Sequence, residues 1–174
     1  MLELIRRCPE YLSGYRDYCS ELRESGCRYF CPMKPELVDE AWYYRTKDVY
    51  DRREKERIDG RARSVHYWAV DDGRFIGEFQ LRLDFTENVM NDIGSVGLAV
   101  RPTEWRKGYG SAILQLGLDI ARSFGMEELL LTIDEENIAS IRTAEKLGAV
   151  YADTIEGPCG AEEMRRLRRY RITL

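Results

Sequence analysis

Six consecutive residues, 106–111, combine two cations with two glycines and read RKGYGS. They follow the alternating apolar run Val96–Val100 and lead into a helical pattern over 112–124. In a glycine-bearing turn at a helix start, backbone N–H groups can point at one anion, and the helix dipole favours negative charge there. Arg106 and Lys107 add positive charge at the same place. The pattern therefore predicts a cradle for the pyrophosphate of a cofactor.

The strand before this turn follows a run of antiparallel strands. Proline cannot donate to a β-ladder, so Pro102 ends the strand. Upstream, the apolar runs 65–70 and 75–85 flank Asp-Asp-Gly at 71–73, which predicts a β-hairpin. Gly77, inside the second run, predicts a bulge or a close backbone approach.

The remaining elements follow from hydrophobic periodicity and from helix start and stop signals. Asn137 is placed to cap a helix that ends at Leu147. The chain is predicted to form one domain over residues 1–174. Its elements are strand 2–6, helices 9–24 and 35–58, the hairpin, polar loop 86–92, strand 96–100, helix 112–124, strand 129–133, helix 137–147, strand 149–154, loop 155–163 and strand 167–174.

The composition is that of an ordinary folded domain. Of 174 residues, 44% are hydrophobic and 33% are charged, with a net charge of −4, which argues against nucleic acid as a partner. No apolar run approaches the roughly 20 residues of a membrane span, so no membrane is expected and the default location is cytoplasmic. The five cysteines show no CxxC spacing and His66 is the only histidine, so no metal site is expected.

Three phosphate-binding motifs compete for residues 106–111. A Walker A loop, GxxxxGK[ST], is absent. A Rossmann fingerprint needs a third glycine in a parallel βαβ unit, whereas GYG here follows antiparallel strands. The third option is the order LAVRP, RKGYGS, a helix, LLLTI, and a helix that Asn137 opens and EKLGA closes. This order resembles the GNAT superfamily of acetyl-CoA-dependent N-acetyltransferases, closest to a bacterial branch of predicted acetyltransferases.

The resemblance implies an α+β acyltransferase fold, with a mixed, mostly antiparallel central sheet that is flanked by helices and splayed at its central strands. It implies that the main chain of Leu98, Ala99 and Val100 binds the pantetheine arm of acetyl-CoA. Asn137 matches the asparagine that steadies the acyl end. The pyrophosphate would lie on the turn formed by Arg106, Lys107, Gly108, Tyr109, Gly110 and Ser111.

Two positions depart from the family pattern. The turn usually begins with glutamine or arginine, and Trp105 stands there in this chain. The positive charge is then left to Arg106 and Lys107, with Arg101 as a further cation. Ala144 occupies the position where many relatives carry the tyrosine that protonates the leaving thiolate.

The catalytic residues stay unassigned at this point. An amine must be neutral to attack a thioester, and an alkylammonium group has a pKa of about 10, so a base or desolvation is needed. Relatives often carry a glutamate on the strand before the turn, and this strand has none. For the acid, Tyr151 is a candidate, whereas His66 in VHYWAV is better interpreted as a packing residue. The candidate bases are carboxylates on or near strands: Glu78, Asp84, Asp92, Asp134 and Glu135.

The leading hypothesis is an N-acetyltransferase that moves the acetyl group of acetyl-CoA to a primary amine by direct transfer in a ternary complex. The acceptor is a small-molecule or peptide amine, and a homodimer is left open. The missing tyrosine and strand carboxylate support an alternative, a non-catalytic GNAT-fold module that senses acyl-CoA. A nucleotide-binding oxidoreductase, on the weak GxG, is the third hypothesis.

Overall fold

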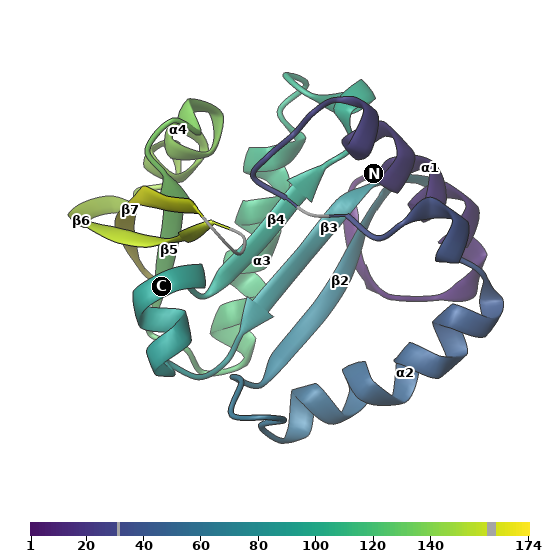
Figure 1. The fold of residues 1–174 in the computed structure, drawn as a ribbon, viewed down its shortest axis with the longest axis horizontal. Helices are drawn as coiled ribbons and strands as arrows, with labels where there is room; N and C mark the ends of the chain where they lie inside the picture. The colour runs from purple at the N-terminus through teal and green to yellow at the C-terminus, as the bar shows by residue number, and fades with distance from the viewer. Residues whose placement is uncertain (31, 160–162) are drawn as a thin grey trace.

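The computed structural model describes residues 1–30, 32–159 and 163–174, whose strands form two sheets (Figure 1). The first sheet has the order β1-β2-β3-β4 and the second the order β5-β7-β6. All ladders between described strands are antiparallel, so the predicted antiparallel character is confirmed. The strands are β1 (Glu3–Arg6), β2 (Ser64–Asp71), β3 (Arg74–Arg82), β4 (Val96–Val100), β5 (Glu128–Asp134), β6 (Val150–Cys159) and β7 (Glu163–Thr173).

Helices cover both faces of the first sheet. On one face α3 packs so closely that Gly117 lies directly against the ring of Phe79. On the opposite face the ring of Tyr15 in α1 stacks on Trp42 of α2 and Trp68 of β2. None of the described helices has the length and apolar character needed to cross a membrane. The α-helices are α1 (Leu12–Glu24), α2 (Glu40–Lys55), α3 (Tyr109–Ser123) and α4 (Ile138–Lys146).

The two sheets meet where β4 begins. The N–H of Ser95 donates to the carbonyl of Leu130 at 2.6 Å, and the N–H of Leu130 donates to Ser95 Oγ at 3.2 Å. Among the described strands, β4 pairs only with β3, and β5 pairs only with β7. The central strands therefore touch at one end and lie in different sheets beyond it, as the resemblance implies (Figure 1).

The close backbone approach predicted at Gly77 is confirmed. A Cβ at this position would lie 2.2 Å from the carbonyl oxygen of Ala99 on β4. The register of the ladder with β2 also shifts beside Gly77, because the consecutive residues Ala69 and Val70 pair with Gly77 and Phe75 and leave Ile76 of β3 as an extra residue. Glycine is therefore required here by the spacing of β3 and β4.

Two predicted loops are wrong. Residues 86–92 are not a simple loop, because a π-helix runs over Val89–Ile93. Residues 155–159 belong to β6 and Glu163 begins β7, and the ladder extends to Cys159 opposite Glu163, whereas residues 160–162 of the predicted loop lie outside the described residues. Gly157-Pro158 suggests a turn in sequence, but β6 is the outer strand of its sheet, where proline is tolerated.

Candidate functional site

The turn between β4 and α3 has the geometry of an anion cradle. Arg106 and Gly108 adopt left-handed backbone angles, with φ of 63° and 88°. The carbonyl of Gly108 accepts the N–H of Ala112 at 3.1 Å, so the first three N–H groups of α3 have no partner within the helix. A Cβ at Gly108 would meet no atom within 4 Å. Unpaired N–H groups beside open space fit a phosphate group.

Two aromatic side chains hold this turn against the first sheet. The indole Nε1 of Trp105 donates to the carbonyl of Val100 at 2.7 Å. The hydroxyl of Tyr109 donates to Asp71 Oδ2 at 2.7 Å. Trp105, which departs from the family pattern, thus fixes the turn to the end of β4 instead of supplying a charge.

The positive charge at the turn comes from two exposed side chains. Lys107 Nζ donates to Glu104 Oε2 at 2.9 Å, and Arg106 forms no ion pair with any described residue. Arg101, in contrast, is 7% exposed and pairs with Glu21 of α1. Arg101 is therefore part of the structure beneath the turn, Lys107 shares its charge with Glu104, and Arg106 is the cation at the turn that no described carboxylate pairs with.

One edge of β4 has no partner among the described strands. The N–H of Arg101 donates to the carbonyl of Ile76 in β3 at 2.8 Å, so the carbonyl of Val100, in the same peptide unit, points away from β3. Directions alternate along an extended chain. The N–H and C=O of Ala99 therefore point towards β3, and those of Leu98 point to the unpaired edge. A ligand chain can add there as a further strand.

Helix α4 packs beside the first turn of α3. Asn137 caps α4 as predicted, because its Oδ1 accepts the N–H of Ser140 at 3.2 Å. A Cβ at Gly110 would lie 3.8 Å from Thr143 Oγ1, which brings the first turn of α3 against α4. Ala144 is 1% exposed within the hydrophobic core. The helix thus places a buried methyl group where the resemblance implies a tyrosine.

Glu78 lies in the middle of β3, where it pairs with Ala99 of β4. The hydroxyl of Tyr18, in α1, donates to Glu78 Oε1 at 3.0 Å. Burial raises the pKa of Glu78 to about 7, although the hydrogen bond from Tyr18 and the charge of Arg7 act in the opposite direction. Part of the side chain remains exposed. This carboxylate can therefore accept a proton near neutral pH.

The strand next to Glu78 carries only small side chains on this face. Ala99 pairs with Glu78, and Gly97 pairs with Gln80, so all four residues face the side that α1 and α2 cover. Gly97 and Gln80 are partly exposed. The β4 strand therefore places no bulky side chain against the polar row that begins at the Glu78 carboxylate.

Asp84 has a different environment. It accepts hydrogen bonds from the Arg63 N–H at 2.8 Å and from the Arg57 side chain at 3.1 Å. Burial acts to raise the pKa of Asp84, but the hydrogen bonds from Arg63 and Arg57 outweigh it and lower the pKa to about 2. This carboxylate joins the segment after α2 to the end of β3.

Tyr151 lies on β6, in the second sheet. It is exposed, its hydroxyl lies 2.9 Å from Thr154 Oγ1, and its ring meets Tyr170 edge to face. These contacts keep the phenol on the β6–β7 hairpin, whereas Glu78 lies on the first sheet.

Two splayed antiparallel sheets, with a helix that starts at a glycine turn beside the open edge of β4, define the acyltransferase fold class that the sequence predicts. The chain belongs to the acetyltransferase (GNAT) family, whose model matches residues 20–149. Among curated proteins, none is significantly similar in sequence.

Solved structures share the fold at low sequence identity. RimJ of Mycobacterium smegmatis, in complex with a CoA disulfide, has a TM-score of 0.75 and 14% identity over 99% of this chain and 81% of that chain. The Salmonella typhimurium protein yncA, with its cofactor acetyl-CoA, has a TM-score of 0.65 and 14% identity, with 99% and 94% covered. A spermidine N-acetyltransferase chimera from Vibrio cholerae SpeG and hSSAT has a TM-score of 0.68 and 14% identity, with 99% and 95% covered. Two of these structures thus hold the CoA moiety that the sequence predicts for this chain.

The sequence alone did not identify Tyr18 or the polar row on β3. Tyr18 lies 60 residues before Glu78, and its apolar stripe on α1 indicates only packing. The row Glu78, Gln80 and Arg82 does leave a signal, because it alternates with Phe79 and Leu81. Which helix covers the polar side is a tertiary property that this alternation does not encode.

Proposed function

We propose that this chain transfers the acetyl group of acetyl-CoA directly to a primary amine of a small-molecule or peptide acceptor, within one ternary complex. The observation that carries the proposal is the position of Glu78 next to Ala99, on the strand whose far edge is open. A proton acceptor with a pKa of about 7 then lies one strand away from the backbone edge that suits a pantetheine arm.

Acetyl-CoA is held in this proposal by backbone groups and two cations. The pantetheine arm lies along Leu98, Ala99 and Val100, and the Leu98 N–H and C=O bind it as an added strand would. The N–H groups of Tyr109, Gly110 and Ser111 receive the pyrophosphate, because Gly108 leaves the space beside them open. Arg106 and Lys107 contribute charge, and Asn137 steadies the acyl end. When bound, acetyl-CoA supplies the thioester carbonyl that the amine attacks.

Glu78 is the general base in this proposal. The amine nitrogen bonds to the acetyl carbon and the amine proton passes to the Glu78 carboxylate. The carbon–sulfur bond breaks with its electron pair on sulfur, so CoA leaves as a thiolate that takes a proton from water. Tyr18 fixes the position of that carboxylate through its hydrogen bond to Oε1. Asp84, which two arginines hold ionised, and Tyr151, which lies on the other sheet, do not share this placement. The proposal therefore assigns the base to Glu78 and not to Asp84 or Tyr151.

Two measurements test the proposal. Isothermal titration should show acetyl-CoA binding that Arg106→Gln weakens, and a panel of primary amines should include one that releases free CoA thiol. No binding at high micromolar acetyl-CoA would overturn the cofactor assignment. Saturable binding with no thiol release for any amine would favour the acyl-CoA sensor, which the buried Ala144 supports.

A further inference from the structure

Three polar side chains of β3 share the face that α1 and α2 cover. Glu78, Gln80 and Arg82 occupy alternate positions, and each is partly exposed. Gly97 of β4 pairs with Gln80, so no side chain of β4 covers the row at that level. The row thus begins at the proposed base and ends at a cation.

Arg82 is a desolvated cation that lacks an anionic partner. Its Nη2 donates to Gln80 Oε1 at 3.1 Å, and its Nη1 donates to the carbonyl of Gly94 at 3.3 Å. It forms no ion pair with any carboxylate in the described part of the chain, and Asp92 acts on it only at longer range. Burial lowers the pKa of Arg82 to about 10, against the influence of Asp92. A buried positive charge is costly unless a negative group pairs with it.

The guanidinium of Arg82 lies above β4. A Cβ at Gly97 would lie 3.8 Å from Arg82 Nη2 and 3.4 Å from Gln80 Oε1. Gly97 is two residues from Ala99, the partner of Glu78, which is about 7 Å along an extended strand. An amine that donates to Glu78 and an oxyanion that accepts from Arg82 each take up one hydrogen-bond length. This spacing therefore suits a ligand whose amine and oxyanion lie a few Å apart.

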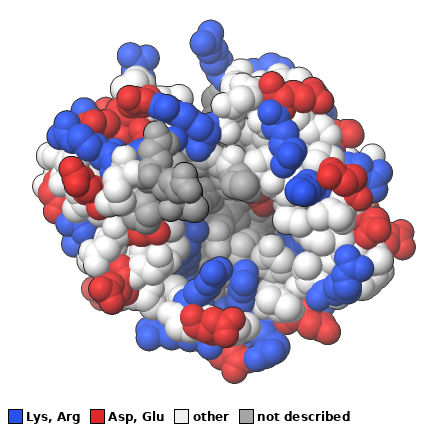
Figure 2. All heavy atoms as spheres, in the orientation of Figure 1, with Lys and Arg blue, Asp and Glu red and all other residues white. Residues whose placement is uncertain are grey.

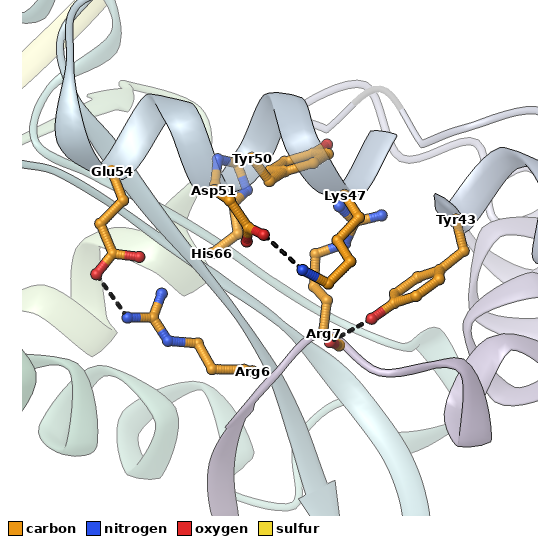
Figure 3. Close-up of a pocket in the computed structure, with 8 residues that line it drawn as sticks. All are labelled: Arg6, Arg7, Tyr43, Lys47, Tyr50, Asp51, Glu54 and His66. Atoms are coloured by element: carbon orange, nitrogen blue, oxygen red, sulfur yellow. Dashed lines mark hydrogen bonds and ion pairs between the residues drawn. The ribbon is translucent and has the colours of Figure 1, made fainter. Parts of the chain in front are cut away.

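The cavity next to this row is also poor in free negative charge. His66 pairs with Gln80 and lines a cavity of about 350 Å³ beneath α2 (Figure 3). The acidic side chains of this cavity are already paired, Asp51 with Lys47 at 2.5 Å and Glu54 with Arg6 at 2.8 Å.

Arg7 adds positive charge to the same cavity. Its guanidinium lies 3.8 Å from the ring centroid of Tyr50 and donates to Thr46 Oγ1 at 3.2 Å. Burial, together with the charges of Arg7, Arg53 and Arg82, lowers the pKa of His66 to about 3, so this histidine is neutral. Figure 2 shows Lys and Arg side chains interspersed with Asp and Glu on the face seen there, so the positive charge next to the polar row is a local property of this cavity. Such a field repels a polycation and attracts an anion.

We infer that the acceptor is an α-amino acid or a close analogue, whose carboxylate pairs with Arg82 while its amine faces Glu78. The inference rests on the proposed function and names the acceptor class for the same site. Arg82 acts on binding and orientation, because a planar guanidinium can hold a carboxylate through two parallel hydrogen bonds. The amine loses its proton to Glu78, and the carboxylate is unchanged by the reaction.

The test compares each amino acid with the same compound lacking the negative charge. The twenty L-amino acids, their amides and spermidine are assayed for thiol release from acetyl-CoA. We expect turnover of at least one amino acid, with kcat/KM about 10- to 100-fold above that of its amide. Arg82→Gln should raise KM for the amino acid by a similar factor and leave the amide unchanged. Arg45→Gln, which alters an exposed arginine of α2, is the matched control.

Three results would overturn the inference. They are no turnover of any amino acid, a higher kcat/KM for spermidine or the amides, and an Arg82→Gln variant in which KM rises equally for the amino acid and for its amide. If Arg82→Gln fails to fold, the preference of the unaltered protein for carboxylate over amide still decides. Titration with acetyl-CoA is run in parallel. Binding of acetyl-CoA with turnover of other amines would leave the proposed function intact and reject only the acceptor class.

Discussion

Glu78→Gln separates the roles of one side chain in stability and in catalysis. Glutamine has nearly the same shape as glutamate, and its Oε1 can still accept the hydrogen bond from Tyr18. What the substitution removes is the ability to ionise or to take a proton. The variant should therefore be more stable than the unaltered protein at alkaline pH and much less active.

The expected gain in stability follows from the raised pKa of Glu78. Between the ordinary value of 4.5 and the folded-state value of about 7, the folded chain binds the proton more tightly than the unfolded chain. Its stabilising contribution is complete below pH 4.5 and is lost as the pH rises through 7. The difference between the two pKa values corresponds to about 3 kcal/mol as an upper bound. Glu78→Gln should thus raise the free energy of unfolding at pH 8 by up to about 3 kcal/mol, and the melting temperature by roughly 6–12 °C.

The activity should change in the opposite direction. Loss of a general base typically lowers the rate by about 10²–10⁴-fold. In the unaltered protein, kcat/KM should rise with pH through a midpoint near 7, and this limb should be absent from the residual activity of Glu78→Gln.

Urea unfolding at pH 5 and pH 8, with thiol release measured across the same range, checks both parts. Glu87→Gln, at an exposed position, is the control. A Glu78→Gln variant that is less stable than the unaltered protein at pH 8, or that keeps its full rate, would refute the reasoning.

Three further substitutions probe the surroundings of the site. Gly108→Ala should introduce about 1–2 kcal/mol of backbone strain, because φ is 88°, and weaken acetyl-CoA binding by about tenfold on titration. Asp84→Asn should lower the free energy of unfolding by about 2 kcal/mol at pH 7. The stability that comes from the lowered pKa of Asp84 is present above the ordinary value of 3.8 and is lost as the pH falls through about 2. Equal urea midpoints for the two proteins at pH 7 would contradict a stabilising role of the ion pairs. Arg101→Gln should cost about 1.5–3 kcal/mol, because Glu21 loses its cation and keeps only the hydrogen bonds from Thr103. The loss should be seen as a lower melting temperature, with the acetyl-CoA affinity of the folded protein unchanged.

The cofactor region could be read from sequence because its signals are local. The β4 strand, Pro102 after it and the Asn137 cap act through the backbone of adjacent residues, and each lies where predicted. The start of α3 was predicted three residues too late. Gly108 suggests a longer turn, yet its left-handed φ already places Tyr109 in the helix.

The acceptor region could be read only in part. Alternation with Phe79 was enough to assign Glu78 to the polar side of β3, but Asp84 has the same parity, and sequence did not distinguish the two carboxylates. The distinction is tertiary, since α1 brings the Tyr18 hydroxyl and desolvation to Glu78, whereas Asp84 lies at the strand end within reach of Arg63. The alternation of apolar and polar residues predicts the face of the strand on which a side chain lies, whereas the pKa of that side chain depends on the residues that pack around it.

A β-strand at the edge of a sheet has one open edge and two faces, so β4 can contact two substrates at separate places. Its open edge presents the Leu98 amide groups, one face packs against α3, and the other face carries Gly97 and Ala99 beside the polar row of β3. A substitution can alter a face of β4 without altering its edge, because side chains form the face and the backbone forms the edge. A larger residue at Gly97 should therefore block the acceptor while acetyl-CoA still binds, since its side chain would meet Gln80 and Arg82 and leave the edge unchanged. Direct transfer in one ternary complex requires that acetyl-CoA and the acceptor bind at the same time, and the separate edge and face of β4 allow this.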